Sequence, residues 1–196
     1  HVAAIFNDIE NCKKYYDMAI SNSEDEIILF SYALDLIHLR EFSEALPYLL
    51  RLKENPGILS LDRIYFNIGR CYHEEVCLYK SIEYYKKTIK LNNTFLKAYV
   101  NLGNVYKDFG LFEWVLDCYE YVLSYDENFP EALVNIVDLY EKMKDDKNYE
   151  KFKSRLDDNI FNPSLKYNVG LFFKEDNVSK FLKSMDEASK TYVSQI

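Results

Sequence analysis

The chain has 196 residues, of which 48% are hydrophobic, and its 24 Lys and Arg residues stand against 32 Asp and Glu residues, for a net charge of −8. This acidic balance argues against a nucleic-acid partner, because proteins that bind nucleic acid present a basic footprint to the phosphates. No apolar run approaches the eighteen residues that a membrane-spanning helix needs, so membrane insertion is not expected.

Apolar residues recur at helical spacing along the whole chain, which predicts an all-α protein. Turn-forming clusters such as Asn55-Pro56-Gly57 and Asn162-Pro163 separate the periodic segments. In chain order, the expected helices span residues 2–20, 24–39, 42–54, 60–74, 78–91, 95–109, 112–125, 129–143, 147–159, 164–174 and 177–194.

One pattern of large, apolar and small residues repeats at a fixed spacing. The set Tyr99, Leu102, Gly103 and Tyr106 lies thirty-four residues after Tyr65, Ile68, Gly69 and Tyr72 and thirty-four before Leu133, Ile136, Val137 and Tyr140. A further set, Leu29, Tyr32, Ala33 and Leu36, comes thirty-six residues before Tyr65. Internal similarity at such a period indicates an array of repeats, each of which packs on its neighbours.

The order of these residues resembles the tetratricopeptide repeat (TPR), a helix-turn-helix unit. The resemblance implies an α-solenoid wound as a right-handed superhelix, with residues 1–196 forming a single array. The expected repeats are approximately 26–61, 62–95, 96–129, 130–162 and 163–196, after a preceding helix at 1–22. Gly69 and Gly103 would each cost a helix interior about 1 kcal/mol relative to Ala. Close approach of the paired helix accounts for them, and Gly110 fits the turn between two helices.

In the TPR family, one stripe of each first helix lines a concave groove that binds extended peptides. Asn67, Asn101 and Asn135 are equally spaced along this stripe, and a side-chain amide can both donate to and accept from a peptide main chain. The string AYVNLGNVYKDFG is similar to repeats of O-linked N-acetylglucosamine transferase, whose asparagines hold substrate peptides in this way. The candidate peptide-binding residues are Arg63, Phe66, Asn67, Arg70, Lys97, Val100, Asn101, Asn104, Lys107, Val134, Asn135 and Asp138.

Charge along the expected groove differs from that of the whole chain. In the second and third repeats Arg63, Arg70, Lys97 and Lys107 outnumber Glu74 and Asp108, whereas acidic residues prevail in the fourth. The ligand is therefore expected to place acidic residues toward the N-terminal half of the groove.

Another TPR subclass grips a chaperone carboxylate with Lys, Asn and Arg. Its first pair would fall here on Phe30 and Leu34 or on Phe66 and Arg70, so a co-chaperone role is not expected.

No catalytic residue, metal site or cofactor is expected. The stretch His73-Glu74-Glu75-Val76-Cys77 begins like a zinc-protease helix but lacks the second His. Cys12, Cys71, Cys77 and Cys118 have neither zinc-site spacing nor the density of a disulfide scaffold, so reduced, buried thiols are expected. Trp114 is either a packing residue or part of a second, convex contact surface.

These patterns favour a non-enzymatic module, located in the cytoplasm, that binds an extended peptide or a partner protein in its concave groove. Two alternatives stay open. The chain would also suit the substrate-recognition arm of a larger enzyme, such as a glycosyltransferase, or a scaffold subunit of a multiprotein assembly. The identity of the partner and the oligomeric state are not encoded in these patterns.

Overall fold

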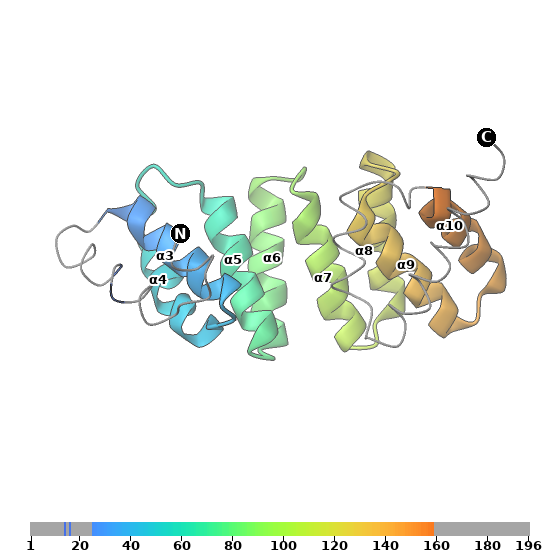
Figure 1. Ribbon diagram of the computed structural model, residues 1–196, viewed down its shortest axis with the longest axis horizontal. Helices are drawn as coiled ribbons and strands as arrows, with labels where there is room; N and C mark the ends of the chain where they lie inside the picture. Colours follow the sequence, from blue (N-terminus) through green and yellow to red (C-terminus); the bar gives the residue numbers. More distant parts are fainter. Residues whose placement is uncertain (1–13, 15, 17–24, 159–196) are drawn as a thin grey trace, which may run out of the picture. The chain divides into compact units, whose positions relative to one another are not determined.

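The computed structural model describes residues 14, 16 and 25–158, and every regular element in that part is an α-helix (Figure 1). The helices are α3 (Glu26–His38), α4 (Phe42–Glu54), α5 (Leu61–Glu74), α6 (Leu78–Leu91), α7 (Leu96–Asp108), α8 (Phe112–Tyr125), α9 (Pro130–Met143) and α10 (Asp146–Asp158). The all-α prediction is confirmed, and the predicted ends agree within two residues. The predicted helices 2–20, 164–174 and 177–194 lie outside the described residues, apart from Lys14 and Tyr16.

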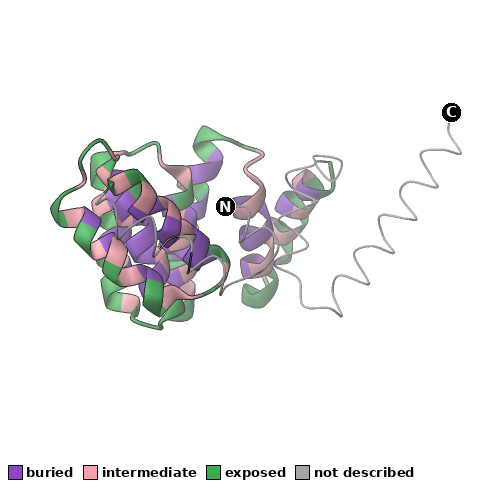
Figure 2. Cartoon of the chain, turned by 60° about the vertical axis from the view of Figure 1, so that its left-hand side comes forward, coloured by how far each residue is buried: buried purple, intermediate pink, exposed green. Residues whose placement is uncertain are grey.

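The chain divides into two compact units, His1–Val115 and Leu116–Ile196. Within the first unit α3 packs on α4, α4 on α5, α5 on α6 and α6 on α7, so consecutive helices form hairpins. Within the second unit α9 packs on α10. In both, buried residues lie on the helix sides that meet a neighbouring helix, while the turns are largely exposed (Figure 2). None of the described helices combines the length and apolarity needed to cross a bilayer.

The turn inside each hairpin contains a residue in the left-handed backbone region. These residues are Arg40, Val76, Gly110 and Lys144, with φ of 64°, 59°, 73° and 56°. At each turn the next amide bonds back to a carbonyl in the last turn of the preceding helix, as Cys77 N does to Tyr72 O over 2.8 Å. This is the bond of a Schellman cap. The prediction for Gly110 is confirmed, while the other three turns achieve the same geometry without glycine.

Gly69 lets the two helices of the second hairpin approach closely. A Cβ atom placed on Gly69 would lie 2.7 Å from Cε1 of Tyr85 on α6, closer than real Cβ contacts. The hydroxyl of Ser81, also on α6, donates to the carbonyl oxygen of Gly69 over 2.9 Å. Tyr85 is completely buried. The close approach predicted at Gly69 is therefore confirmed, and Gly103 is likewise buried.

A polar network ties the beginning of α5 to the end of α6. The buried carboxylate of Asp62 accepts hydrogen bonds from the Ser60 hydroxyl and from Asn92 Nδ2, the latter over 2.8 Å. It also accepts from the backbone N–H of Arg63. Burial raises the pKa of Asp62, but these hydrogen bonds outweigh burial and leave the pKa below its usual value. The network closes the hairpin at the end opposite its turn.

Candidate functional site

The candidate site in the first unit is a face formed by α5 and α7, which we call the basic face. It consists of Arg63, Asn67 and Arg70 on α5 and Lys97, Asn101, Asn104 and Lys107 on α7. Within each helix these residues follow one another at intervals of three or four, which places them on one side of the helix. The two helices touch each other, and both pack against α6.

The predicted site residues differ in exposure. Arg63 and Lys97 are exposed, and Arg70, Asn101, Asn104, Lys107 and Asp138 are half-buried. The expectation of an exposed stripe is wrong for Phe66, Asn67, Val100, Val134 and Asn135, which are all buried. The three residues from the fourth predicted repeat, Val134, Asn135 and Asp138, belong to α9 in the second unit.

Packing explains why Phe66 is not available as an open pocket wall. Its ring lies 4.8 Å from the ring of Phe95, which precedes α7, and 5.9 Å from that of Tyr85 on α6. Phe66 is only 9% exposed as a result. It therefore serves mainly as a floor beneath the basic face, and a role in holding ligand side chains stays a prediction.

The asparagines of the predicted ladder have different surroundings. Asn67 uses its amide within α5, because Nδ2 donates to the Arg63 carbonyl over 2.8 Å and Oδ1 accepts from Arg70 Nη1 over 3.3 Å. Asn101 is half-buried and lies beside the Tyr85 hydroxyl. Asn135 is buried on α9. Asn67 thus orients a neighbouring cation, and contact with a peptide main chain stays a prediction for all of them.

The two arginines of α5 lie against aromatic rings. The guanidinium carbon of Arg70 is 6.0 Å from the centre of the Phe66 ring, and that of Arg63 is 5.5 Å from the centre of the Phe30 ring on α3. Neither forms an ion pair with a carboxylate in the described part of the chain, and the same holds for Lys97. A guanidinium that rests on a ring still presents N–H groups at its edge. These cations can therefore meet an incoming anion.

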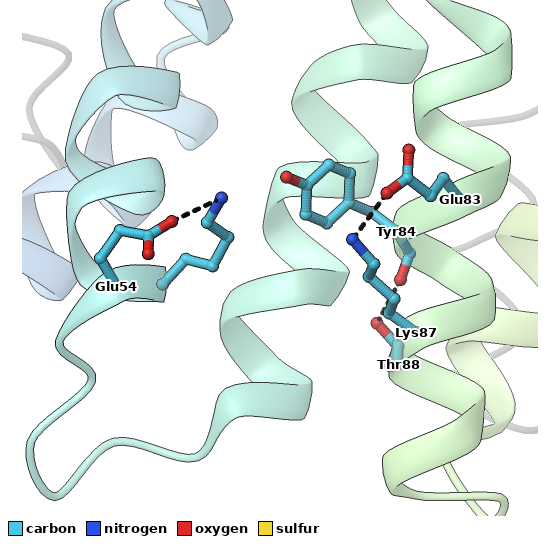
Figure 3. Close-up of polar contacts among 6 residues, drawn as sticks. Glu54, Glu83, Tyr84, Lys87 and Thr88 are labelled. Carbon is cyan, nitrogen blue, oxygen red and sulfur yellow. Dashed lines mark hydrogen bonds and ion pairs between the residues drawn. The ribbon is translucent and has the colours of Figure 1, made fainter.

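The acidic residues beside the basic face are already paired. Glu74 accepts from Arg40 over 2.9 Å, and Asp108 lies 2.8 Å from His73 Nε2. Lys53 on α4 and Lys87 on α6 differ from the cations of the basic face, because each of these lysines is paired with a carboxylate. Figure 3 shows the contact of Glu54 with Lys53, at 2.8 Å, and that of Lys87 with Glu83, at 2.6 Å. The hydrogen bond that the Lys87 ammonium donates to Glu83 raises the pKa of Lys87.

Sequence reasoning missed Tyr85 as a member of this site. Its hydroxyl is completely buried and forms no hydrogen bond with a described group. Burial raises its pKa, while the nearby Asn101 amide and Arg70 guanidinium act in the opposite direction. The sequence carried one signal for it, because the helix that packs against Gly69 has a tyrosine at this position rather than a phenylalanine.

The other residues considered for chemistry or binding are possible metal ligands, the cysteines and Trp114. In the part of the chain that the structure covers, no group of three or more His, Cys, Asp or Glu side chains is placed to hold a metal ion. Cys71 and Cys118 are buried as predicted, and burial raises the pKa of Cys71 to about 12, but the prediction is wrong for Cys77, which is exposed. Cys12 lies outside the described residues. Trp114 packs edge-on against Tyr106 yet keeps 51% of its surface exposed.

Comparison with protein families identifies the helical unit. Residues 62–95, which cover α5 from its second residue and all of α6, match the model of the tetratricopeptide repeat family. Residues 62–95 are therefore identified as one tetratricopeptide repeat. The match covers the second of the predicted repeats, and the α-solenoid fold class of TPR hairpins is confirmed. A search of curated proteins finds no significant match.

Solved structures share this TPR fold at low sequence identity. MamA is 18% identical with a TM-score of 0.64, over 76% of this chain and 91% of that chain. PilF from Pseudomonas aeruginosa is 16% identical with a TM-score of 0.67, over 87% and 77%. The first TPR domain of Spaghetti (RPAP3), bound to the HSP90 peptide SRMEEVD, is 17% identical with a TM-score of 0.55, over 62% and 95%. The TPR fold supports a role in protein–protein interaction or as a scaffold.

Proposed function

We propose that this TPR protein binds an extended, acidic segment of a partner protein on its basic face, without catalysing a reaction. The observation that carries the proposal is the unequal pairing of charges. Arg63, Arg70 and Lys97 meet no carboxylate in the described part of the chain, whereas the neighbouring Glu74 and Asp108 are held by Arg40 and His73. A local excess of cations on an acidic protein selects an anionic partner.

The spacing of the cations favours an extended ligand over a compact anion. Arg63 and Arg70 lie two helical turns apart on α5, and Lys97 lies on another helix. A single small anion cannot meet side chains distributed in this way, whereas an extended peptide presents several side chains in succession. The structural relative Spaghetti (RPAP3) holds a peptide, SRMEEVD, that is rich in acidic residues, which adds support for this class of ligand.

A peptide selection tests the proposal without knowledge of the natural partner. Random peptides displayed on phage are selected against the chain, and parallel selections use a variant with Arg63→Glu and Lys97→Glu. We expect Asp and Glu to be enriched with the wild type and depleted with the variant. A selection that yields no binders, or binders without acidic enrichment, would contradict the proposal.

A second candidate function, a scaffold subunit of an assembly, rests on exposed apolar side chains near two hairpin turns. Tyr79 is 81% exposed and contacts the ring of Phe109 at 5.1 Å between centres. Leu111, Phe112 and Trp114 are also exposed. Clustered apolar surface of this kind is typical of protein contacts. Sedimentation of the purified chain tests this candidate by measuring its oligomeric state. If the chain is a soluble monomer, these exposed side chains stay available to another subunit.

A further inference from the structure

Two pairs of aromatic rings bridge α6, α7 and the start of α8 within the first unit. The ring of Tyr79, in the first turn of α6, lies 5.1 Å from that of Phe109, which follows α7. Trp114, in the first turn of α8, packs edge-on against Tyr106 of α7, with 5.2 Å between the ring centres. Tyr79 and Trp114 nevertheless keep 81% and 51% of their surface exposed. Exposed aromatic side chains of this kind are typical of a surface that another protein covers.

A cation and an anion lie beside Trp114 on this surface. The ammonium of Lys86 is 5.7 Å from the centre of the Trp114 ring, and Glu113 directly precedes Trp114 in the first turn of α8. The carboxylate of Glu83, on the same helix as Lys86, is paired with Lys87 at 2.6 Å. Lys86 and Glu113 are both exposed, and neither forms an ion pair in the part of the chain that the structure describes. The aromatic surface therefore carries one available charge of each sign.

This pair of charges favours a second copy of the chain as the partner. In a two-fold symmetric contact both copies use the same surface, so each contact between two different residues occurs twice. A surface that holds charges of one sign only repels its own copy, whereas a surface that holds both signs is complementary to itself. When the exposed rings of two copies pack together, Lys86 of each copy can meet Glu113 of the other.

We propose that the surface formed by Tyr79, Lys86, Phe109, Glu113 and Trp114, which we call the aromatic patch, joins two copies of this chain across a two-fold axis. The inference rests on the second candidate function, a scaffold subunit, and names the subunit that covers the exposed rings. Because few side chains form the patch, we expect a reversible dimer with a dissociation constant in the micromolar range.

Exchange of charges between copies tests this contact. Sedimentation velocity of the chain is measured from about 1 μM to about 300 μM for the wild type, for Lys86→Glu, for Glu113→Lys and for an equimolar mixture of these two variants. Lys97→Glu is the matched control, because Lys97 is an exposed lysine outside the aromatic patch. Thermal unfolding followed by circular dichroism verifies that each variant is folded.

We expect the wild type and Lys97→Glu to dimerise with equal dissociation constants. Lys86→Glu and Glu113→Lys should each weaken dimerisation at least about tenfold, because the symmetry makes each substitution act at two contacts. The mixture of these two variants should form dimers again, since the reversed charges attract each other when one variant pairs with the other.

Tryptophan fluorescence gives an independent measurement of the same contact. Trp114 is the single tryptophan of the chain, so the emission reports on the aromatic patch alone. We expect the emission of the wild type to shift to shorter wavelength as the concentration rises through the dissociation constant, because dimerisation removes the indole from water. Over the same concentrations, the emission of Lys86→Glu should shift less.

Several results would overturn the proposal. A wild type that stays monomeric over the whole range would exclude the second copy but not the scaffold candidate, whose exposed side chains then remain available to a different subunit. Dimers that persist unchanged in both charge variants, or a mixture that stays monomeric while the wild type dimerises, would exclude the pairing of Lys86 with Glu113. Dimerisation without a change in Trp114 emission would place the contact elsewhere on the chain.

Discussion

Gly69 and Tyr85 fit together across the α5–α6 hairpin, with the tyrosine ring occupying the space where a side chain on residue 69 would lie. A Cβ atom there would be 2.7 Å from Cε1 of the ring. This relationship explains why a residue that weakens an isolated helix lies in the middle of α5, and it connects the stability of the repeat to the position of the Tyr85 hydroxyl.

A double-mutant cycle tests the Gly69–Tyr85 contact. Gly69→Ala gains about 1 kcal/mol of helix propensity but overpacks the contact at a cost of about 1–3 kcal/mol. We expect it to destabilise the wild type and to stabilise a Tyr85→Leu background. Urea unfolding of the four proteins gives the coupling energy, expected to exceed about 0.5 kcal/mol. Additive effects would mean that the ring does not occupy this space.

The left-handed turn residues provide a second test. Val76 has φ of 59° and is 75% exposed, so its β-branched side chain strains the backbone without compensating burial. We expect Val76→Gly to stabilise the protein by about 1 kcal/mol, measured by thermal unfolding. The reciprocal change, Gly110→Val, should destabilise it by a similar amount, because a Cβ atom on Gly110 would meet no described atom within 4 Å beyond its chain neighbours and only the left-handed backbone would be strained. Stabilisation by both changes would contradict the assigned turn geometry.

The pH dependence of stability tests the Asp62 network. Burial opposes ionisation of Asp62, but hydrogen bonds from Ser60, Asn92 and the Arg63 amide lower its pKa overall. A lowered pKa in the folded state stabilises the protein above the unfolded pKa of about 3.9, and this contribution is lost as the pH falls through the folded value.

Asp62→Asn should therefore destabilise the protein by about 1 kcal/mol at pH 7, and its deficit relative to the wild type should shrink below about pH 4. Urea unfolding between pH 7 and pH 3 measures the difference, with Asp117→Asn at an exposed position of α8 as the control. A deficit that stays constant over this range would show that ionisation of Asp62 makes no contribution.

Thiol reactivity distinguishes the described cysteines. Cys77 is exposed, whereas Cys71 and Cys118 are buried and the pKa of Cys71 is raised to about 12. Because the thiolate is the reactive form, we expect iodoacetamide at pH 8 to modify Cys77 rapidly and Cys71 only after unfolding. Peptide mapping by mass spectrometry identifies the modified residues. Comparable labelling of Cys71 and Cys77 in the native protein would contradict the burial of Cys71.

The helices could be predicted from the sequence because the apolar periodicity is strong and turn-forming residues separate the periodic segments. Gly69 also indicated close contact with the paired helix. A glycine in the middle of a helix lowers helix stability, so its presence there needs a compensating contact. The breaks at Arg40, Val76 and Lys144 were predicted, but their left-handed backbone was not, because a Schellman cap can hold a non-glycine residue when the surrounding hydrogen bonds fix the backbone.

The site was harder to predict than the fold. Helical periodicity assigns a residue to a side of its helix but cannot show whether a neighbouring helix covers that side. Phe66 is consequently buried by Tyr85 and Phe95 rather than open. The contacts Arg40–Glu74 and His73–Asp108 carried a signal that could have been used, because their separations of 34 and 35 residues equal the 34-residue repeat period or exceed it by one.

The association rate of an acidic peptide tests the central claim most directly. Stopped-flow fluorescence of a selected peptide is compared for the wild type, for Arg63→Glu with Lys97→Glu, and for Lys86→Glu with Lys90→Glu. The last variant changes net charge equally at two exposed positions of α6, outside the basic face. We expect reversal on the basic face to slow association at least about tenfold at low salt, more than the α6 control does, and the difference should shrink as salt screens the charges. Equal association rates for the two variants, or rates independent of salt, would contradict recognition of an acidic segment by the basic face.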